Sequence, residues 1–274
     1  MTKYIDVGNV IKQKNERLYN ILPNFVLSYF RRIIHEDDLN DDLTLLEGLD
    51  TRQKFRVFLE NRNFLVEVIG TENVPSDGRF MFTSNHPLGG LDGIVFYDTV
   101  ADMFPDAKFL VNDILMNIPG VEDCFLPLNK HGSNSREYFK KIDEACASDS
   151  QILSFPAGIV SRKIDGVVQD LSWMKSCVSY PKKYKRDVVP VFINGRNSAF
   201  FYNLANLRKK LGIQANIEMF FLVDELYKFQ NRTLQIAFGK PIPYSYFDSS
   251  KKDKEWAAYL REQTYKLGKS ITEK

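Results

Sequence analysis

The stretch FMFTSNHPLGGLDG, residues 80–93, carries the clearest structural pattern in the chain. The apolar residues Phe80 to Phe82 lead into Ser-Asn-His, and a Gly-Gly loop then precedes Asp92 and a helical run. A strand, loop and helix in this order are typical of α/β domains, whose sites lie at the carboxyl ends of the strands. The stretch therefore predicts His86 at the end of a strand and Asp92 at the N-cap of the next helix.

Short β-rich runs separated by helical segments extend through most of the chain from residue 64 onward. The expected strands are residues 64–69, 80–84, 108–111, 124–128, 151–155, 188–193, 217–223 and 234–238. The expected helices are residues 93–103, 135–147 and 253–267. Strands that alternate with helices predict an α/β fold over residues 63–274, with a mainly parallel or mixed sheet flanked by helices.

Residues 1–62 have a different, helical pattern, and we expect them to form an N-terminal helical extension of that domain. Within residues 22–34, apolar side chains recur with the i, i+3, i+4 spacing of a helix. The first twenty residues are too charged for a signal peptide, and no apolar stretch approaches the roughly 18 residues that a transmembrane helix needs. We therefore expect a protein that does not span a membrane.

Composition narrows the functional classes further. Of the 274 residues, 44% are hydrophobic, which excludes a disordered or fibrous chain. The 37 Lys and Arg nearly balance the 35 Asp and Glu, so nucleic acid is not an expected partner. Three cysteines without a CxxC pair and three histidines predict neither a disulfide framework nor a metal site, and fit a reducing compartment.

His86 and Asp92 are the candidate catalytic pair. The glycines between them allow a tight loop, which would bring the carboxylate to the imidazole. A histidine oriented by an aspartate is the general-base half of a catalytic triad. The alternatives are a helix-capping aspartate and an ordinary loop histidine, and the pair alone does not decide between these readings.

Three further segments follow the His86 segment in order: residues 120–130, 154–162 and 188–194. Together the four segments resemble the four blocks of the glycerolipid acyltransferase superfamily, whose familiar member is lysophosphatidic acid acyltransferase. The resemblance covers about residues 80–195. The sequences HPLGGLDG and FPAGIVSR are similar to those of the hemolysin-like branch, which O-acylates lyso-ornithine or N-acyl-glycine lipids in bacteria.

Three departures from the superfamily pattern bear on the acceptor. Five residues rather than four separate His86 from Asp92, Ala157 replaces a glutamate, and Leu128, Asn129 and Lys130 stand where a phosphate-binding arginine is expected. A bidentate arginine–phosphate contact has no equivalent in asparagine. The sequence therefore predicts an acceptor with a carboxylate or zwitterion rather than a phosphate monoester.

The resemblance implies an enzyme that moves an acyl chain from an acyl-carrier-protein or coenzyme A thioester to a lyso-lipid hydroxyl, without another cofactor. It implies His86 as general base, Asp92 as its orienting partner, and backbone N–H groups near Gly158 as oxyanion donors. The expected substrate-binding residues are Asn129, Lys130, Phe155, Pro156, Ala157, Gly158, Ser161 and Arg162. Of these, Arg162 is the expected carboxylate ligand.

The substrate class also implies contact with a membrane surface, and we expect a peripheral protein on the cytoplasmic face of the inner membrane. Residues 22–34 and 200–211 are the candidate contact segments, although an apolar stripe of this kind is more often part of a core. Two other functions stay open, a lysophosphatidate acyltransferase and a non-catalytic lipid-binding protein. The loop HPLGG also loosely resembles the oxyanion loop of lipases, but the sequence lacks the Gly-x-Ser-x-Gly turn of a serine hydrolase, which disfavours that function.

Overall fold

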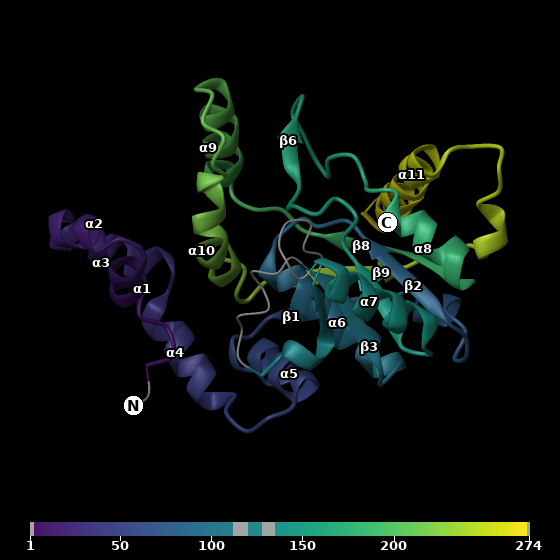
Figure 1. Ribbon diagram of the computed structural model, residues 1–274, viewed down its shortest axis with the longest axis horizontal. Coiled ribbons are helices and arrows are strands. Elements are labelled where there is room, and N and C mark those ends of the chain that lie inside the picture. The colour runs from purple at the N-terminus through teal and green to yellow at the C-terminus, as the bar shows by residue number, and fades with distance from the viewer. Residues whose placement is uncertain (1–2, 112–119, 128–134, 273–274) are drawn as a thin grey trace.

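The computed structural model describes residues 3–111, 120–127 and 135–272. Five helices precede the first strand, as the N-terminal pattern predicted. They are α1 (Val7–Lys14), α2 (Glu16–Ile21), α3 (Asn24–Ile33), α4 (Glu36–Leu45) and α5 (Thr51–Asn61). Figure 1 shows α1 to α3 standing apart from the sheet, with α4 leading back toward it. None of the helices in the described ranges is long and apolar enough to cross a membrane.

A seven-stranded sheet forms the centre of the α/β domain. Its strands are β1 (Leu65–Ile69), β2 (Phe80–Ser84), β3 (Ala107–Val111), β4 (Phe125–Pro127), β5 (Gln151–Ser154), β8 (Asp187–Asn194) and β9 (Thr233–Phe238). The spatial order is β1-β9-β8-β2-β5-β3-β4, and the β8–β9 pair is antiparallel while the other pairs are parallel. The sheet is therefore mixed and mostly parallel, as predicted.

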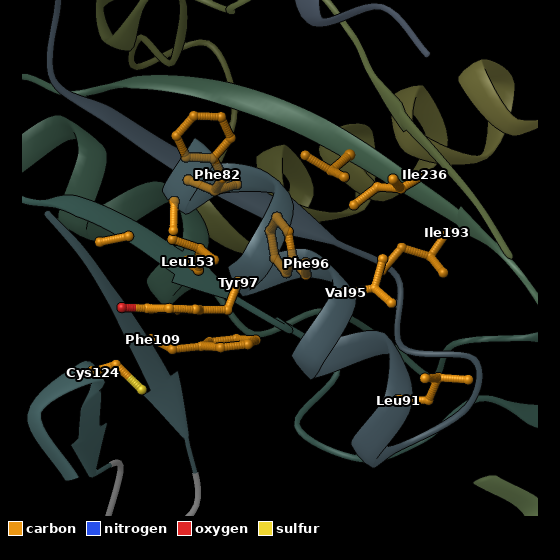
Figure 2. Packing of buried hydrophobic residues seen from close by; sticks show 14 of the residues in the cluster. Phe82, Leu91, Val95, Phe96, Tyr97, Phe109, Cys124, Leu153, Ile193 and Ile236 are labelled. Carbon is orange, nitrogen blue, oxygen red and sulfur yellow. The ribbon is translucent and has the colours of Figure 1, made fainter. Parts of the chain in front are cut away.

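Helices pack against both faces of the sheet. The remaining helices are α6 (Gly90–Met103), α7 (Ser135–Ala147), α8 (Ser176–Tyr184), α9 (Ala199–Lys210), α10 (Leu222–Tyr227) and α11 (Asp253–Thr272). Successive strand residues alternate between the faces. In β2, Phe80 and Phe82 pack with α5 and α6, whereas Met81 packs with Ile142 of α7 on the opposite face. Figure 2 shows Phe96 of α6 in the same core cluster as Phe82 of β2 and Leu153 of β5.

The prediction of a strand at residues 217–223 is wrong. This segment is a 3-10 helix, Ile217–Phe221, that continues into α10. A short apolar run does not distinguish a strand from a helix by itself. The helical backbone turns Glu218 into the interior and leaves Phe220 60% exposed, which an apolar sequence pattern cannot anticipate. The antiparallel hairpin of β6 (Arg162–Ile164) and β7 (Val167–Gln169) was also not predicted.

Polar contacts connect the N-terminal helices to the α/β domain. In α4, the carboxylate of Asp42 accepts a hydrogen bond from Arg62 Nε at 2.8 Å and another from the Tyr227 hydroxyl at 2.7 Å. The imidazole of His35 stacks on the Tyr227 ring, with centroids 4.3 Å apart. The extension is therefore anchored to α10, beside the cavity described below.

Candidate active site

The carboxyl ends of β2 and β5 bring two of the sequence blocks together. The two strands are parallel neighbours, with Phe82 opposite Leu153 and Thr83 opposite Ser154. His86 and Phe155 follow these strand ends, although 69 positions separate them in the sequence. Their rings stack with centroids 4.0 Å apart and planes inclined by 14°. The sheet register thus places the His86 segment and the Phe155 segment at one site, as the strand-end argument predicted.

The side chains of His86 and Asp92 contact each other directly. His86 Nδ1 lies 3.1 Å from Asp92 Oδ2, and the same oxygen accepts a hydrogen bond from the Leu88 N–H at 2.8 Å. Asp92 is fully buried, whereas the His86 side chain retains 16% exposure. If Nδ1 carries the proton and donates it to Asp92, then Nε2 is the basic nitrogen that can accept a proton from a substrate.

The loop between His86 and Asp92 differs in one respect from the expectation. Helix α6 begins at Gly90 with Gly89 as its N-cap, so Asp92 lies in the first turn rather than at the cap. Gly89 has φ +97°, a conformation that side chains other than glycine rarely adopt. This turn accommodates the extra residue between His86 and Asp92, so the carboxylate still reaches the imidazole.

Hydrogen bonds hold the backbone on either side of His86. The amide of Asn85 donates to the Ile193 carbonyl at 2.9 Å and accepts from the Ile193 N–H at 2.8 Å, which fixes the loop to β8. The Ser161 N–H donates to the His86 carbonyl at 2.7 Å. Asn85 is buried, so its amide takes the place of a strand partner just beyond the end of β2.

The segment from Phe155 to Ile159 forms a tight turn at the site. The Gly158 N–H donates to the Phe155 carbonyl at 3.0 Å, and Gly158 has φ +70°. The Pro156 carbonyl accepts from the Met174 N–H at 2.9 Å, which joins this turn to the chain before α8. Because the Gly158 N–H closes the turn, the neighbouring N–H groups of Ala157 and Ile159 are the better candidates for stabilising an oxyanion.

A large apolar cavity opens at His86. Its volume is about 1130 Å³, above the roughly 300–1,000 Å³ that is usual for small-molecule pockets. The walls come from α4, α5, α6, the ends of the central strands, α7, α8 and α10. Among its lining residues are His86, Phe155, Ala157, Gly158, Leu43, Phe58, Ile94, Leu110, Ile142, Tyr180 and Leu226. A cavity of this size and character suits long hydrocarbon chains.

Arg162 has a different environment from the one that the sequence suggested. Its guanidinium donates to Glu218 Oε1 at 2.9 Å and to the Val160 carbonyl at 2.6 Å, and Arg208 Nε contacts the other Glu218 oxygen. Desolvation lowers the pKa of Arg162, although the charge of Glu218 opposes this. Arg162 is buried and is not among the described residues that line the cavity, so its place in the structure is that of an internal ion pair.

The other residues that the sequence nominated lie in several places. Ser161 is buried beneath the His86 loop, and Pro156 is buried in the turn described above. Asn129 and Lys130 lie outside the described residues. The sequence reasoning missed Asp170, whose carboxylate contacts the backbone N–H of His86 at 3.2 Å. No local sequence pattern marks Asp170, because it approaches His86 only after the β6–β7 hairpin has formed.

The order of the four blocks, the mixed α/β sheet and the His86–Asp92 pair at an apolar cavity agree with what the resemblance to acyltransferases implied. Residues 9–273 match the sequence family described as Acyltransferase, and the chain belongs to that family. The match includes the N-terminal helices as well as the α/β domain.

Two relatives cover almost the whole chain. The lyso-glycine lipid O-acyltransferase of Bacteroides thetaiotaomicron is 42% identical over 96% of this chain and 97% of its own length. The lyso-glycine lipid O-acyltransferase of Phocaeicola vulgatus is 41% identical over 96% of this chain and 95% of its own. Among solved structures, the 1-acyl-sn-glycerophosphate acyltransferase PlsC of Thermotoga maritima covers 89% of this chain and 92% of its own, with 18% identity and a TM-score of 0.48.

Proposed function

We propose that this acyltransferase transfers an acyl chain from a thioester to the hydroxyl of a monoacylated glycine lipid. The observation that carries the proposal is the 42% identity over 96% of the chain to a lyso-glycine lipid O-acyltransferase. The apolar cavity beside His86 supports it, because both the acyl donor and a monoacylated acceptor bring a hydrocarbon chain to the reacting atoms. An ornithine lipid is the second acceptor of this chemical type.

In the proposed reaction, His86 Nε2 removes the proton from the acceptor hydroxyl as its oxygen attacks the thioester carbonyl carbon. The C–O bond forms, and the tetrahedral intermediate carries negative charge on the former carbonyl oxygen. Backbone N–H groups of Ala157 or Ile159 would stabilise this oxyanion, a contribution of roughly 3–4 kcal/mol per donor in known cases. The C–S bond then breaks, and the proton on His86 passes to the thiolate. Asp92 stabilises the imidazolium between these steps.

The acceptor carboxylate needs a cation at the cavity. Among the described residues that line it, the cationic side chains are Lys54 and Lys175. Lys54 donates to the Gly120 carbonyl at 2.9 Å, whereas Arg162 is occupied by Glu218. Lys175 precedes α8 and lines the cavity with Met174 and Ser176. We therefore assign the carboxylate of the acceptor to Lys175 instead of Arg162.

The lysophosphatidate alternative remains chemically possible, since a lysine also binds phosphate as a point charge. A phosphate monoester carries nearly two negative charges, and partial desolvation of such a group without matched cations is unfavourable. Of the two lysines among the described residues that line the cavity, Lys54 already donates to the Gly120 carbonyl, which leaves Lys175 as the cation assigned to an acceptor.

We further propose that the protein meets its lipid substrates at a membrane surface, on the cytoplasmic face of the inner membrane. Phe25 of α3 is 75% exposed and Tyr29 is 41% exposed, and the last turn of α3 carries Arg31 and Arg32. Exposed aromatic side chains beside cations are typical of helices that lie in the lipid interface. Helix α9 also has exposed apolar side chains, Phe200 and Leu207, and a last turn with three basic residues. Phe200 is less exposed than Phe25, so α9 is the second candidate for membrane contact.

The decisive experiment offers the purified protein an acyl thioester with either N-(3-hydroxyacyl)glycine or lysophosphatidate. Preferential acylation of the glycine lipid is the expected result, and preferential acylation of lysophosphatidate would overturn the acceptor assignment. His86→Ala should lower turnover by about 10²–10⁴-fold. Asp92→Asn should also lower turnover, because a neutral amide no longer stabilises the imidazolium. Asp98→Asn is its matched control, because Asp98 lies on the same helix but faces Arg56. A folded His86→Ala protein with normal turnover would overturn the assignment of His86 as general base and of Asp92 as its orienting partner, while leaving the acyltransferase activity itself in place.

A further inference from the structure

A buried carboxylate lies beneath the His86 loop, outside the four sequence blocks. Asp170 follows the β6–β7 hairpin and is 1% exposed. Its Oδ1 accepts from the His86 N–H at 3.2 Å and contacts the Ser161 hydroxyl at 2.6 Å. Its Oδ2 accepts from Trp173 Nε1–H at 2.9 Å. The carboxylate therefore joins the His86 loop to the chain on both sides of the hairpin.

These contacts fix the main chain of His86 from two directions. The N–H of His86 points to Asp170, and the carbonyl of His86 accepts from the Ser161 N–H at 2.7 Å. Ser161 and Asp170 are themselves hydrogen-bonded across the base of the hairpin. The side chain of His86 is held separately by Asp92 and by the Phe155 ring. Rotation of the peptide units at His86 would thus break contacts that Asp92 does not provide.

Helix α11 holds Asp170 in place in turn. The Asp170 N–H donates to the Tyr265 hydroxyl at 2.8 Å, and Arg261 donates to the Asp170 carbonyl at 2.7 Å. Burial raises the pKa of the Asp170 carboxyl, while the hydrogen bonds from Ser161 and Trp173 oppose the rise. Burial of a carboxyl group costs free energy unless hydrogen bonds compensate for the lost solvation. Both oxygens of Asp170 have such partners, so a specific hydrogen-bond network holds this carboxyl group.

We propose that Asp170 is a positioning residue for catalysis, which sets the orientation of His86 through its main chain. The inference rests on the proposed role of His86 as general base. The backbone N–H of His86 and the side-chain Nε1–H of Trp173 can only donate hydrogen bonds, so each needs an acceptor oxygen. Only a carboxylate at position 170 presents two acceptors in this geometry. Asp170 itself is not among the described residues that line the cavity, so it acts through His86 rather than on the substrate.

This requirement determines the informative substitution. Asp170→Asn keeps the size of the side chain but replaces one acceptor with an NH₂ donor, which must face either His86 N–H or Trp173 Nε1–H. We expect kcat to fall by about 10- to 100-fold, since small displacements of a catalytic group can have effects of this size. The KM values for both substrates should change less than about threefold, because uniform binding is unaffected.

A second substitution tests the cause. Trp173→Phe removes the indole donor, so in Asp170→Asn/Trp173→Phe the NH₂ group can turn toward the phenyl ring and its oxygen toward His86. We expect the double variant to regain several-fold of the lost kcat. Trp256→Phe is the matched control, because Trp256 is equally buried in the same cluster but donates to the Asp248 carbonyl. Its kcat should equal that of the wild type.

The results separate this inference from the proposed function. If His86→Ala is inactive while folded Asp170→Asn retains wild-type kcat, the general base stands and the positioning role is overturned. A proportional rise in KM, or a double variant no better than Asp170→Asn, also overturns it. If Asp170→Asn does not fold, Ser161→Ala decides, because it removes the hydroxyl that contacts both Asp170 Oδ1 at 2.6 Å and the His86 carbonyl at 3.2 Å, and it leaves the carboxylate in place. That variant should lose about 3- to 10-fold in kcat at constant KM, and an unchanged kcat would refute the positioning role.

Discussion

The imidazole of His86 lies parallel to the phenyl ring of Phe155, with the two ring centroids 4.0 Å apart. Phe155 also packs against Phe96 and Phe109 in the core, so the position of the His86 ring is coupled to the packing of α6 and β3. In the proposed reaction the imidazole becomes a cation, and the aromatic face would stabilise that cation. The stack therefore orients the His86 ring.

Replacement of Phe155 should lower activity without abolishing it. Aromatic pairs contribute about 0.5–1.5 kcal/mol beyond their buried area, so we expect Phe155→Leu to reduce kcat/KM by about two- to tenfold. The measurement is steady-state acyl transfer at saturating and limiting acceptor. Phe104→Leu is the control, because Phe104 is a buried aromatic residue that packs on Phe80 and Phe82. Equal losses of activity in the two variants would show that general core packing, and not the stack, is responsible.

The proposed carboxylate ligand can be tested by its effect on the acceptor alone. Lys175→Ala should raise the KM for N-(3-hydroxyacyl)glycine by about 10- to 100-fold, because a hydrogen bond to a charged group contributes about 1.5–3 kcal/mol. The KM for the thioester should stay constant, because Lys175 is assigned to the acceptor and not to the donor. Lys254→Ala, at the exposed start of α11, provides the control. A raised KM for the thioester instead would place the phosphate of the donor at Lys175.

The internal ion pair of Arg162 predicts a large effect on stability. Glu218→Gln leaves Arg162 buried without its counter-charge, and removal of one partner of such a pair typically costs about 3–5 kcal/mol. Urea unfolding measures this loss as a lower free energy of unfolding. Glu262→Gln is the matched control, because Glu262 pairs with Lys266 on the exposed face of α11. That variant should change the free energy of unfolding by less than about 1 kcal/mol. A loss for Glu218→Gln as small as that of the control would contradict the internal role.

The ion pair of Glu218 with Arg162 also makes the free energy of unfolding depend on pH. Desolvation would raise the pKa of Glu218, but the hydrogen bond from Arg208 and the charge of Arg162 hold it below its ordinary value of 4.5. The stabilisation is therefore complete above pH 4.5 and is lost as the pH falls through the lower pKa of the folded state. The difference in unfolding free energy between wild type and Glu218→Gln should narrow in that acidic range. A constant difference down to the acid unfolding of the wild type would contradict this assignment.

Membrane contact through α3 predicts a loss of lipid binding when its exposed aromatic side chain is removed. Phe25→Ser should weaken binding to vesicles containing anionic lipids by about tenfold, since burial of such a side chain contributes roughly 1.5–3 kcal/mol. Vesicle sedimentation measures this affinity directly. Leu65→Ser, on the edge strand β1, removes another exposed apolar side chain and should bind as the wild type does. Unchanged vesicle binding by Phe25→Ser would contradict membrane contact through α3 and would favour α9 as the contact helix.

The sequence by itself determined the class of the fold and the pair at its site. Alternating strand and helix patterns predicted the mixed α/β sheet, because the period of apolar residues reflects which face of each element is buried. His86 and Asp92 are close in the sequence, so a single loop with Gly89 could bring them together. The same local reasoning placed the turn after Phe155 at a strand end, where parallel strands collect their loops.

Tertiary structure decided what depends on partners distant in the chain. Residues 217–223 form helical turns in which Glu218 contacts Arg162 and Arg208, and no apolar run in the sequence expresses these contacts. For the same reason Arg162 is an internal ion pair rather than an exposed ligand. Asp170 meets His86 only through the hairpin and α11, over 84 positions of sequence. Local patterns encode the burial of each element, whereas polar networks are specified only when packing brings donors and acceptors from separate elements into contact.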